Sequence, residues 1–171
     1  MRLFFALWPD ADVTAQLASA ADKLTMRGPA RLVNPKNYHL TLAFIGEVAS
    51  ARLAVLQQTG RSLHAPRCDI SFDSMEYWPT SQVVVAAAQE VPSGLMGLWA
   101  QLHDALAMPR TRFRAHVTLA RKATQAPVLQ AMSPISWHAT TFGLVRSDTG
   151  GAESSYTVLD TWPLLYETWN P

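Results

Sequence analysis

Two short segments of the sequence each place a histidine two residues before a threonine. Residues 39–43 (HLTLA) and 116–120 (HVTLA) are identical at four of five positions, and the remaining position is apolar in both. Because alternate side chains of a strand point to the same face, the histidine and threonine of each segment share one face. The residue between them and the following leucine then fill a core on the other face. If the two strands flank one cleft, two imidazoles and two hydroxyls converge on it.

This set of side chains suits the hydrolysis of a phosphate ester. A neutral imidazole can take a proton from water, and an imidazolium can give a proton to the leaving oxygen. Histidine titrates near pH 6.5 when unperturbed, so both forms are available near neutrality. The hydroxyls of Thr41 and Thr118 can donate hydrogen bonds to phosphoryl oxygens as charge builds there. The pattern therefore predicts acid–base catalysis by His39 and His116.

Two other interpretations apply to the same histidines: core residues held by hydrogen bonds, or metal ligands. Duplication of the wider motif argues against the first. Against the second, two histidines are too few, and neither segment adds a carboxylate or thiolate at ligand spacing. A third H-x-T, His138-Ala139-Thr140, lacks the apolar alternation and is taken as a chance occurrence. His64, at a helix end, and His103, within a helix, are expected to be surface or capping residues.

Length and composition limit the class of protein. The chain has 171 residues, 49% hydrophobic and 16% charged, and its net charge of +1 argues against a protein that coats nucleic acid by charge alone. We expect a single domain over residues 1–171. The only cysteine, Cys68, excludes an intramolecular disulfide or a zinc site of several cysteines and favours the cytoplasm. The sequence contains neither a secretory signal nor an apolar stretch of membrane-spanning length.

The periodicity of apolar residues predicts alternating strands and helices. Strands are expected over 2–8, 39–45, 68–77, 82–88, 115–120, 137–146 and 156–162, and helices over 11–26, 51–63, 93–108 and, in a short form, 125–132. The last two strands should form a hairpin connected through residues 148–151. The similar order of elements before and after the middle of the chain predicts an α+β fold. It would have two similar lobes, each an antiparallel sheet with helices packed outside, and the H-x-T strands would flank a central cleft.

With these motifs the sequence resembles the 2H phosphoesterase superfamily, named for its two H-x-T-x motifs. Within it, the chain is similar to the RNA 2′,3′-cyclic phosphodiesterases, formerly called 2′-5′ RNA ligases. The matching segments are residues 1–6 (MRLFFA), 39–46 (HLTLAFIG), 113–122 (FRAHVTLARK) and 156–164 (YTVLDTWPL). The family often has a proline directly before the second histidine, where this chain has Ala115. The exchange removes a stiff residue but no chemical group.

The resemblance implies hydrolysis of a terminal 2′,3′-cyclic phosphate to a 2′-phosphate without a metal or other cofactor. It also implies the roles of the residues. His39 matches the proton donor to the leaving 3′ oxygen, His116 matches the proton acceptor that activates water, and Thr41 and Thr118 match phosphate-binding hydroxyls. Arg121 matches a further phosphate-binding position. On an ideal strand Arg121 would face away from His116, so this role requires a β-bulge or a strand end.

The expected partners are RNA ends or nucleotides that carry a 2′,3′-cyclic phosphate, bound by a monomer without membrane attachment. Three alternatives stay open: reversible 2′-5′ RNA ligation, hydrolysis of another cyclic phosphate, and a module that binds RNA ends or nucleotides without turnover. Ligation driven by ATP is not favoured, because neither a P-loop nor a lysine-centred nucleotidyl-transfer motif is present.

Basic and aromatic side chains indicate how RNA could be held. Five basic residues surround the second motif and form either a solvated loop or a patch for RNA phosphates. They are Arg110, Arg112, Arg114, Arg121 and Lys122. Tyr38, Phe5 and Trp137 are candidates for stacking on a nucleobase at the edge of the cleft.

Overall fold

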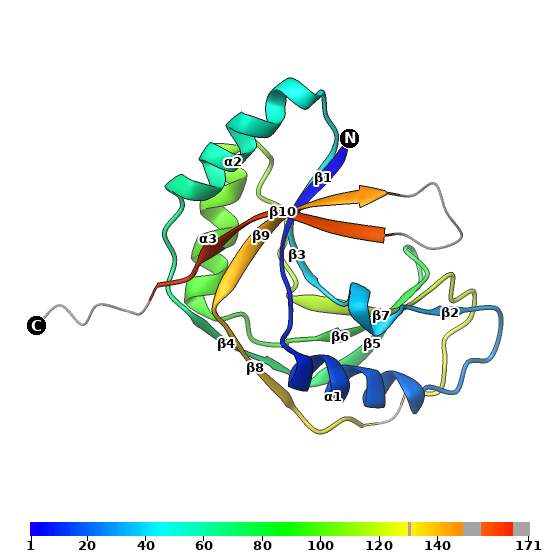
Figure 1. Cartoon of the computed structure of the whole chain (residues 1–171). Coiled ribbons are helices and arrows are strands. Elements are labelled where there is room, and N and C mark those ends of the chain that lie inside the picture. The colour runs from blue at the N-terminus through cyan, green and yellow to red at the C-terminus, as the bar shows by residue number, and fades with distance from the viewer. Residues whose placement is uncertain (130, 149–154, 166–171) are drawn as a thin grey trace, which may run out of the picture.

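The structure, a computed structural model, describes residues 1–129, 131–148 and 155–165 (Figure 1). Strands and helices alternate along these residues. In chain order they are β1 (Arg2–Leu7), α1 (Ala11–Asp22), β2 (Arg31–Leu32), η1 (Pro35–Asn37), β3 (Leu40–Glu47), η2 (Ser50–Arg52), α2 (Leu53–Ser62), β4 (Cys68–Phe72), β5 (Ser74–Trp78), β6 (Val83–Ala87), α3 (Ser93–Ala105), β7 (His116–Arg121), β8 (Ile135–Ala139), β9 (Thr141–Asp148) and β10 (Ser155–Pro163).

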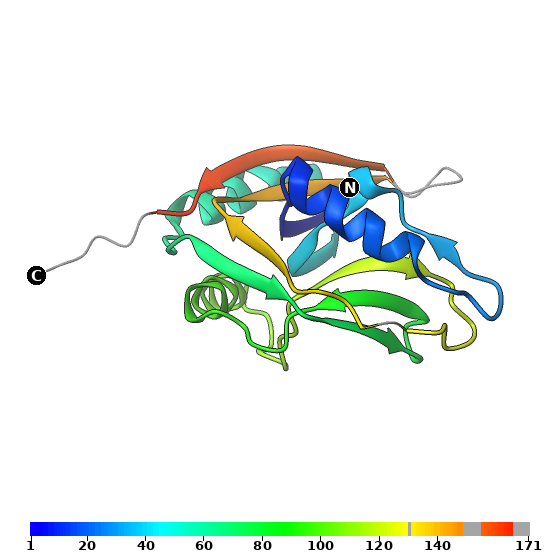
Figure 2. The same ribbon diagram turned by 90° about the horizontal axis from the view of Figure 1, so that it is seen from below.

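The strands form two four-stranded antiparallel sheets and one two-stranded ribbon. The first sheet has the order β10-β9-β1-β3, the second has the order β2-β7-β6-β5, and β4 pairs with β8. Figure 2 shows the sheets as two layers, with β9 and β10 (orange and red) in one and the green strands β5 and β6 in the other. One H-x-T motif lies on β3, at the edge of the first sheet, and the other lies on β7, inside the second.

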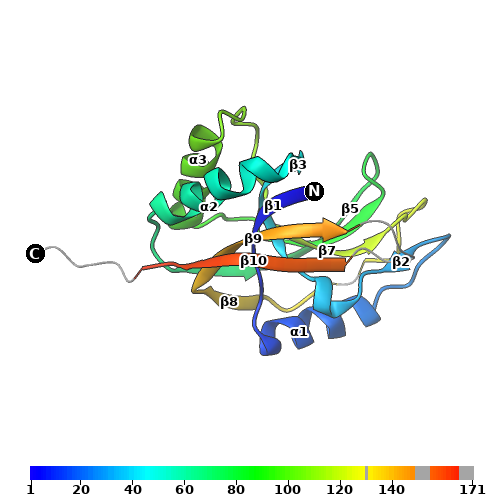
Figure 3. The same cartoon turned by 45° about the horizontal axis from the view of Figure 1, so that its top comes forward.

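The helices cover one face of each sheet. Helix α2 contacts β9 and β10, α1 contacts β7 and β8, and α3 contacts β3 and α2. Figure 3 shows β9 and β10 running between α1 on one side and α2 and α3 on the other. One cluster of buried apolar residues joins all three helices to both sheets, with Leu17, Leu56 and Leu98 from the helices and Phe5 and Val117 from the strands. In the part of the chain that the structure describes, the opposite sheet faces are free of helices and carry the H-x-T side chains.

Local sequence explains how α1 follows β1. The side chain of Asp10 caps the helix by accepting a hydrogen bond from the backbone N–H of Val13 at 2.8 Å. The helix then buries Val13, Leu17 and Ala21, which recur at helical spacing. In β1, five of the six residues are buried because the core covers one face and aromatic side chains of the site cover the other.

Both H-x-T strands contain a bulge at the same place. In β3, Thr41 pairs with Ala6 and Ala43 pairs with Phe5, which leaves Leu42 without a partner. In β7, Thr118 pairs with Val85 and Ala120 pairs with Val84, which leaves Leu119 without one. A bulge adds one residue to a strand and reverses the alternation of the side chains that follow. Each H-x-T motif is therefore followed by a shift of face directly after its threonine.

The structure confirms the α+β class with antiparallel sheets, and it corrects the arrangement along the chain. The lobes are not the two halves of the sequence: the first sheet is built from both ends of the chain, and the second from the middle. Residues 68–77 form two strands in different sheets. The break is at Asp73, whose N–H donates to Ala87 and whose carboxylate accepts from the N–H of Gln89.

Two further expectations differ from the structure. Residues 125–129 and 131–132 form no helix; Val128 instead pairs with Thr25 in an isolated bridge, and an eight-residue segment containing Pro127 is too short to nucleate a helix by itself. Residues 137–146 belong to two strands, because β8 pairs with β4 and only β9 forms the hairpin with β10. The expected connection at residues 149–151 lies outside the described residues.

Candidate active site

A pocket of about 330 Å³ opens on the helix-free face of the first sheet and reaches the end of β7. It is lined by Arg2, Phe4, His39, Thr41, Phe44, Arg121, Ser147 and Tyr156. Three of the five residues selected from the sequence thus lie together: His39, Thr41 and Arg121. The bulge at Leu119 explains why Arg121 faces the pocket. With Leu119 as the extra residue, Arg121 pairs with Val83, and its side chain lies on the face that carries His116 and Thr118.

His116 and Thr118 are half-buried on β7 and are not part of the pocket lining. His116 nevertheless interacts electrostatically with His39 and is affected by Arg121, and both of these residues line the pocket. Strands β3 and β7 contact each other. Burial is the main cause that lowers the pKa of both histidines, the charge of Arg121 lowers both further, and the charge of His116 adds to the shift of His39. Arg121 is therefore the charged group that the two halves of the site share.

Each site histidine donates a hydrogen bond to the backbone carbonyl two residues before it. Nδ1 of His39 lies 2.7 Å from the carbonyl oxygen of Asn37, and Nδ1 of His116 lies 2.7 Å from that of Arg114. Because a carbonyl only accepts, Nδ1 must hold the hydrogen in both neutral rings. The Nε2 atom of each ring is then left to accept a proton when the ring is neutral, or to donate one when it is charged.

Aromatic rings surround His39. The ring of Trp8 stacks on the imidazole at 5.0 Å and 17°, the ring of Tyr156 approaches edge-on at 5.0 Å, and that of Phe4 lies at 5.0 Å. Burial in this setting lowers the pKa of His39 to about 4, the hydrogen bond with Asn37 opposes this, and Arg121 lowers it further. The imidazolium form of His39 is therefore a strong acid.

His116 has a different setting. Its ring lies 4.5 Å from that of Trp78, and burial is the main cause that lowers its pKa. The hydrogen bond with the carbonyl of Arg114 opposes the shift, the charges of Arg114 and Arg121 add to it, and that of Glu76 opposes it. Charged side chains thus lie around His116 and add to the effect of burial, whereas aromatic rings enclose His39.

The sequence did not single out Phe4, Trp8, Glu76, Trp78 or Tyr156. Phe4 alternates with Leu3 and Phe5 on β1, Trp8 follows the end of that strand, and a strand that is apolar on both faces gives no indication of which face meets the core. Tyr156 lies in a segment that was noted only as part of the resemblance. Glu76 and Trp78 share a face of β5, and the alternation of polar and apolar residues there was the available signal.

The three candidates for base stacking are wrong. Phe5, Tyr38 and Trp137 are 0%, 2% and 3% exposed and belong to the core cluster. Phe5 is one residue out of phase with Phe4, so it points to the opposite face of β1. The same parity separates Tyr38 from His39.

The other histidines lie outside the site. His138, in the third H-x-T, is exposed on β8, and its Nδ1 lies 2.7 Å from the carboxylate of Asp69. His64 is exposed after α2, as expected. His103 was expected on the surface, but it is 7% exposed: its ring nitrogens face the carbonyl oxygens of Pro109 at 3.0 Å and of the bulged Leu42 at 3.3 Å.

The five basic residues near the second motif do not form one free patch. Arg110 pairs with Asp104, and Arg114 pairs with Glu76. Arg121 faces the pocket, and Arg112 and Lys122 are exposed. Arg121 is thus the member of this group that meets the pocket.

Two features were searched for over the described residues. Among the described residues there is no group of three or more histidine, cysteine, aspartate or glutamate side chains that could hold a metal ion. None of the helices in this part of the chain is long and apolar enough to cross a membrane.

Comparison with known proteins identifies the family. Residues 7–86 match the family model described as LigT like Phosphoesterase. The RNA 2′,3′-cyclic phosphodiesterase of Thermus thermophilus is 31% identical over 98% of this chain and 92% of its own length. The chain belongs to the LigT-like phosphoesterases of the 2H superfamily.

Two further relatives support this assignment. The RNA 2′,3′-cyclic phosphodiesterase of Escherichia coli is 29% identical over 95% of this chain and 96% of its own. The crystal structure of E. coli LigT complexed with 3′-AMP has a TM-score of 0.82 and 31% identity, and the match covers 95% of this chain and 97% of that one. Fold and family therefore agree with the two-motif sequence pattern.

Proposed function

We propose that the protein hydrolyses the 2′,3′-cyclic phosphate at the end of an RNA, or of a nucleotide, to a 2′-phosphate. The observation that carries the proposal is the repeated bulged strand, which presents two histidines in one tautomer beside a pocket that contains Arg121. The relatives are named for this activity, and one of them binds 3′-AMP. In keeping with the lone free thiol of Cys68, we propose a cytoplasmic monomer.

The reaction is a displacement at phosphorus. His116, neutral, accepts a proton from water at Nε2 while the water oxygen forms a bond to phosphorus. The bond between phosphorus and the 3′ oxygen breaks, and His39, protonated, gives its Nε2 proton to that oxygen. The products are a 2′-phosphate monoester and a free 3′-hydroxyl. Each proton transfer contributes typically about 10²–10⁴-fold in rate.

The remaining groups stabilise negative charge. Thr41 and Thr118 donate hydrogen bonds to the phosphoryl oxygens, and the guanidinium of Arg121 balances the charge that builds on them. A bound phosphate also favours the protonated form of His39, which the free protein disfavours. Substrate binding therefore favours the protonation of His39 that the reaction requires.

The test is turnover of 2′,3′-cyclic AMP and of a short RNA with a cyclic-phosphate end, in excess EDTA, by the purified full chain. We expect complete conversion to the 2′-phosphate, identified by ³¹P NMR and by chromatography against 2′- and 3′-AMP. His138→Ala is the control, because it removes an exposed histidine of the same H-x-T spacing. It should keep near-wild-type activity.

Other products would contradict the proposal. A 3′-phosphate product would reverse the assignment of the bond that breaks. Activity lost in EDTA and restored by a divalent cation would replace the two-histidine mechanism with metal catalysis. Binding of the RNA end without turnover would indicate a binding module, and joining of the cyclic end to a 5′-hydroxyl without hydrolysis would indicate a ligase.

A further inference from the structure

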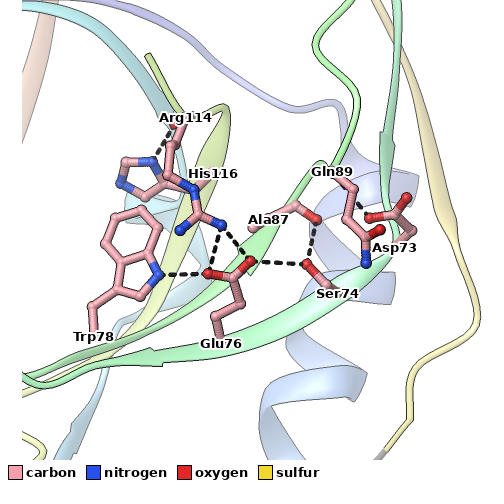
Figure 4. A network of polar contacts seen from close by, with 8 residues as sticks. All are labelled: Asp73, Ser74, Glu76, Trp78, Ala87, Gln89, Arg114 and His116. Carbon is pink, nitrogen blue, oxygen red and sulfur yellow. Dashed lines mark hydrogen bonds and ion pairs between the residues drawn. The ribbon is translucent and has the colours of Figure 1, made fainter. Parts of the chain in front are cut away.

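The carboxylate of Glu76 lies at the centre of a polar network behind His116 (Figure 4). It accepts hydrogen bonds from Nη2 of Arg114 at 2.6 and 2.8 Å, from Nε1 of Trp78 at 2.7 Å and from the hydroxyl of Ser74 at 3.2 Å. The side chain is 25% exposed. These donors hold the carboxylate in place and favour its charged form, so the pKa of Glu76 is lowered although burial opposes this.

The two main partners of Glu76 are also the neighbours of His116. The carbonyl of Arg114 accepts the Nδ1 hydrogen of His116, and the ring of Trp78 lies 4.5 Å from the imidazole. The guanidinium of Arg114 lies over the ring of Trp78 at 5.1 Å. Figure 4 shows the guanidinium and the indole converging on Glu76 from the side of the histidine. Glu76 thus binds the side chains of both residues that contact the ring of His116.

The same residues carry the charge that His116 experiences. Burial is the main cause that lowers the pKa of His116, the cations of Arg114 and Arg121 lower it further, and the anion of Glu76 raises it. His39 is a further titratable neighbour: burial is the main cause that lowers its pKa, and the charge of His116 adds to it. Because Arg114 and Glu76 form an ion pair, the anion of Glu76 offsets part of the effect of the Arg114 cation on His116.

We propose that Glu76 is a positioning residue for the reaction, holding Arg114 and Trp78 against His116 and balancing the Arg114 charge beside it. This inference rests on the proposed function, since it assigns support to the base of that reaction. The corresponding support of His39 is made of Phe4, Trp8 and Tyr156, without a carboxylate. The two lobes therefore support their histidines by different means.

Removing either end of the pair distinguishes this role from a merely structural one. Glu76→Gln leaves the Arg114 cation unbalanced, so the pKa of His116 should fall. Arg114→Gln removes the cation, so the pKa of His116 should rise. A purely structural ion pair would disturb the ring in the same way from either end. Arg114→Lys, which keeps the charge, should leave the pKa of His116 near its wild-type value.

The experiment is an NMR titration of the histidine side chains in the folded full chain, with the His116 signal assigned by its loss in His116→Gln. Asp160→Asn is the control, since it breaks an Arg–carboxylate pair with Arg61 on α2, on the helix-covered side. Circular dichroism at each pH verifies that every variant is folded. In parallel, Glu76→Gln should lower kcat about 10- to 100-fold with KM changed less than threefold, as expected for a misplaced reacting group.

Opposite shifts in Glu76→Gln and Arg114→Gln, with none in Asp160→Asn, support the proposal. Shifts of the same sign, or no shift, overturn it, and hydrolysis by the wild type in that case leaves the proposed function standing. Opposite shifts in a wild type that hydrolyses no cyclic phosphate establish the action of Glu76 on His116 and overturn the proposed function instead. Because the titration needs no turnover, the two failures are distinguishable.

Discussion

The two site histidines are alike in their hydrogen bonds and unlike in their surroundings. Each donates its Nδ1 hydrogen to the carbonyl two residues earlier, and this leaves Nε2 of both rings for the proposed proton transfers. Trp8, Phe4 and Tyr156 then enclose His39, while Trp78 contacts His116 beside the Arg114–Glu76 pair. In the proposed reaction this difference lets two copies of one motif perform opposite proton transfers.

The dependence of kcat/KM on pH follows from the lowered pKa values of both histidines. It should be bell-shaped and centred below pH 6.5, because the pKa of His39 is about 4 and that of His116 is also lowered. As the pH rises above these values, neither ring holds the proton that the leaving oxygen needs. As the pH falls below them, both rings are protonated and neither can accept a proton from water.

Steady-state kinetics from pH 3.5 to 9 on 2′,3′-cyclic AMP measures this profile. The profile of kcat should extend to higher pH than that of kcat/KM, since the bound phosphate anion stabilises the imidazolium. A plateau of kcat/KM that continues above pH 7.5 would show that burial does not control the site.

At the level of the strand, one bulge in each H-x-T strand brings a further residue to the pocket. Leu119 is the extra residue in β7, and with it Arg121 shares a face with His116 and Thr118. The corresponding bulge at Leu42 in β3 brings Phe44 into the pocket lining beside His39 and Thr41. The repeat in sequence is therefore matched by a repeat in strand geometry.

Arg121 and the adjacent Lys122 provide a matched test of the bulge. Arg121→Gln should raise KM for the cyclic phosphate about tenfold, which corresponds to the loss of about 1.4 kcal/mol of a charge-assisted hydrogen bond. Lys122→Gln removes the same charge one residue later, outside the pocket lining, and should change KM less than twofold. Equal effects of the two variants, measured by initial rates at constant ionic strength, would reduce the role of Arg121 to net charge.

Helix packing behind the first sheet can be tested with two glycines. In α2, a Cβ added at Gly60 would lie 2.3 Å from the ring of Trp162, which is buried and packs against Phe5 and Phe142. Gly60→Ala should therefore lower the free energy of unfolding by about 1–3 kcal/mol. In α3, a Cβ at Gly97 would meet no atom within 4 Å. Gly97→Ala should therefore raise the free energy of unfolding by about 0.5–1 kcal/mol.

Urea denaturation of both variants, followed by circular dichroism, makes the comparison. If Gly60→Ala were as stable as Gly97→Ala, the contact between α2 and Trp162 would be looser than the structure shows.

The spacing of apolar residues in the sequence predicted many of the helices and strands, and the predictions that failed have physical causes. The positions of β1, β3, α2 and β7 follow from apolar spacing. The division of residues 68–77 into two strands does not follow from local sequence. It depends on the pairing of β4 with β8, which is far away in the sequence, while β5 pairs with β6. The choice of Phe5 over Phe4 fails for a related reason: only the tertiary structure determines which apolar face of β1 meets the core.

In the whole molecule, the chain interleaves its segments so that the strands that carry the two H-x-T motifs contact each other. Both ends of the chain form the sheet that holds His39, the middle forms the sheet that holds His116, and one apolar cluster joins the two. The duplicated motifs could be read from the sequence together with the need for a bulge before Arg121. The interleaved path and the Glu76 network could not, since they depend on contacts between distant segments.

The central claim is that these two histidines act as one acid–base pair, and the kcat values of single and double variants in EDTA test it most directly. His39→Ala and His116→Ala should each lower kcat about 10³–10⁴-fold, and the double variant should lose little more than either single one, since residues that act as a unit are not additive. Thr41→Ala and Thr118→Ala should lose less, because both proton transfers remain. Losses that multiply in the double variant, or near-wild-type activity in either single one, would contradict the account.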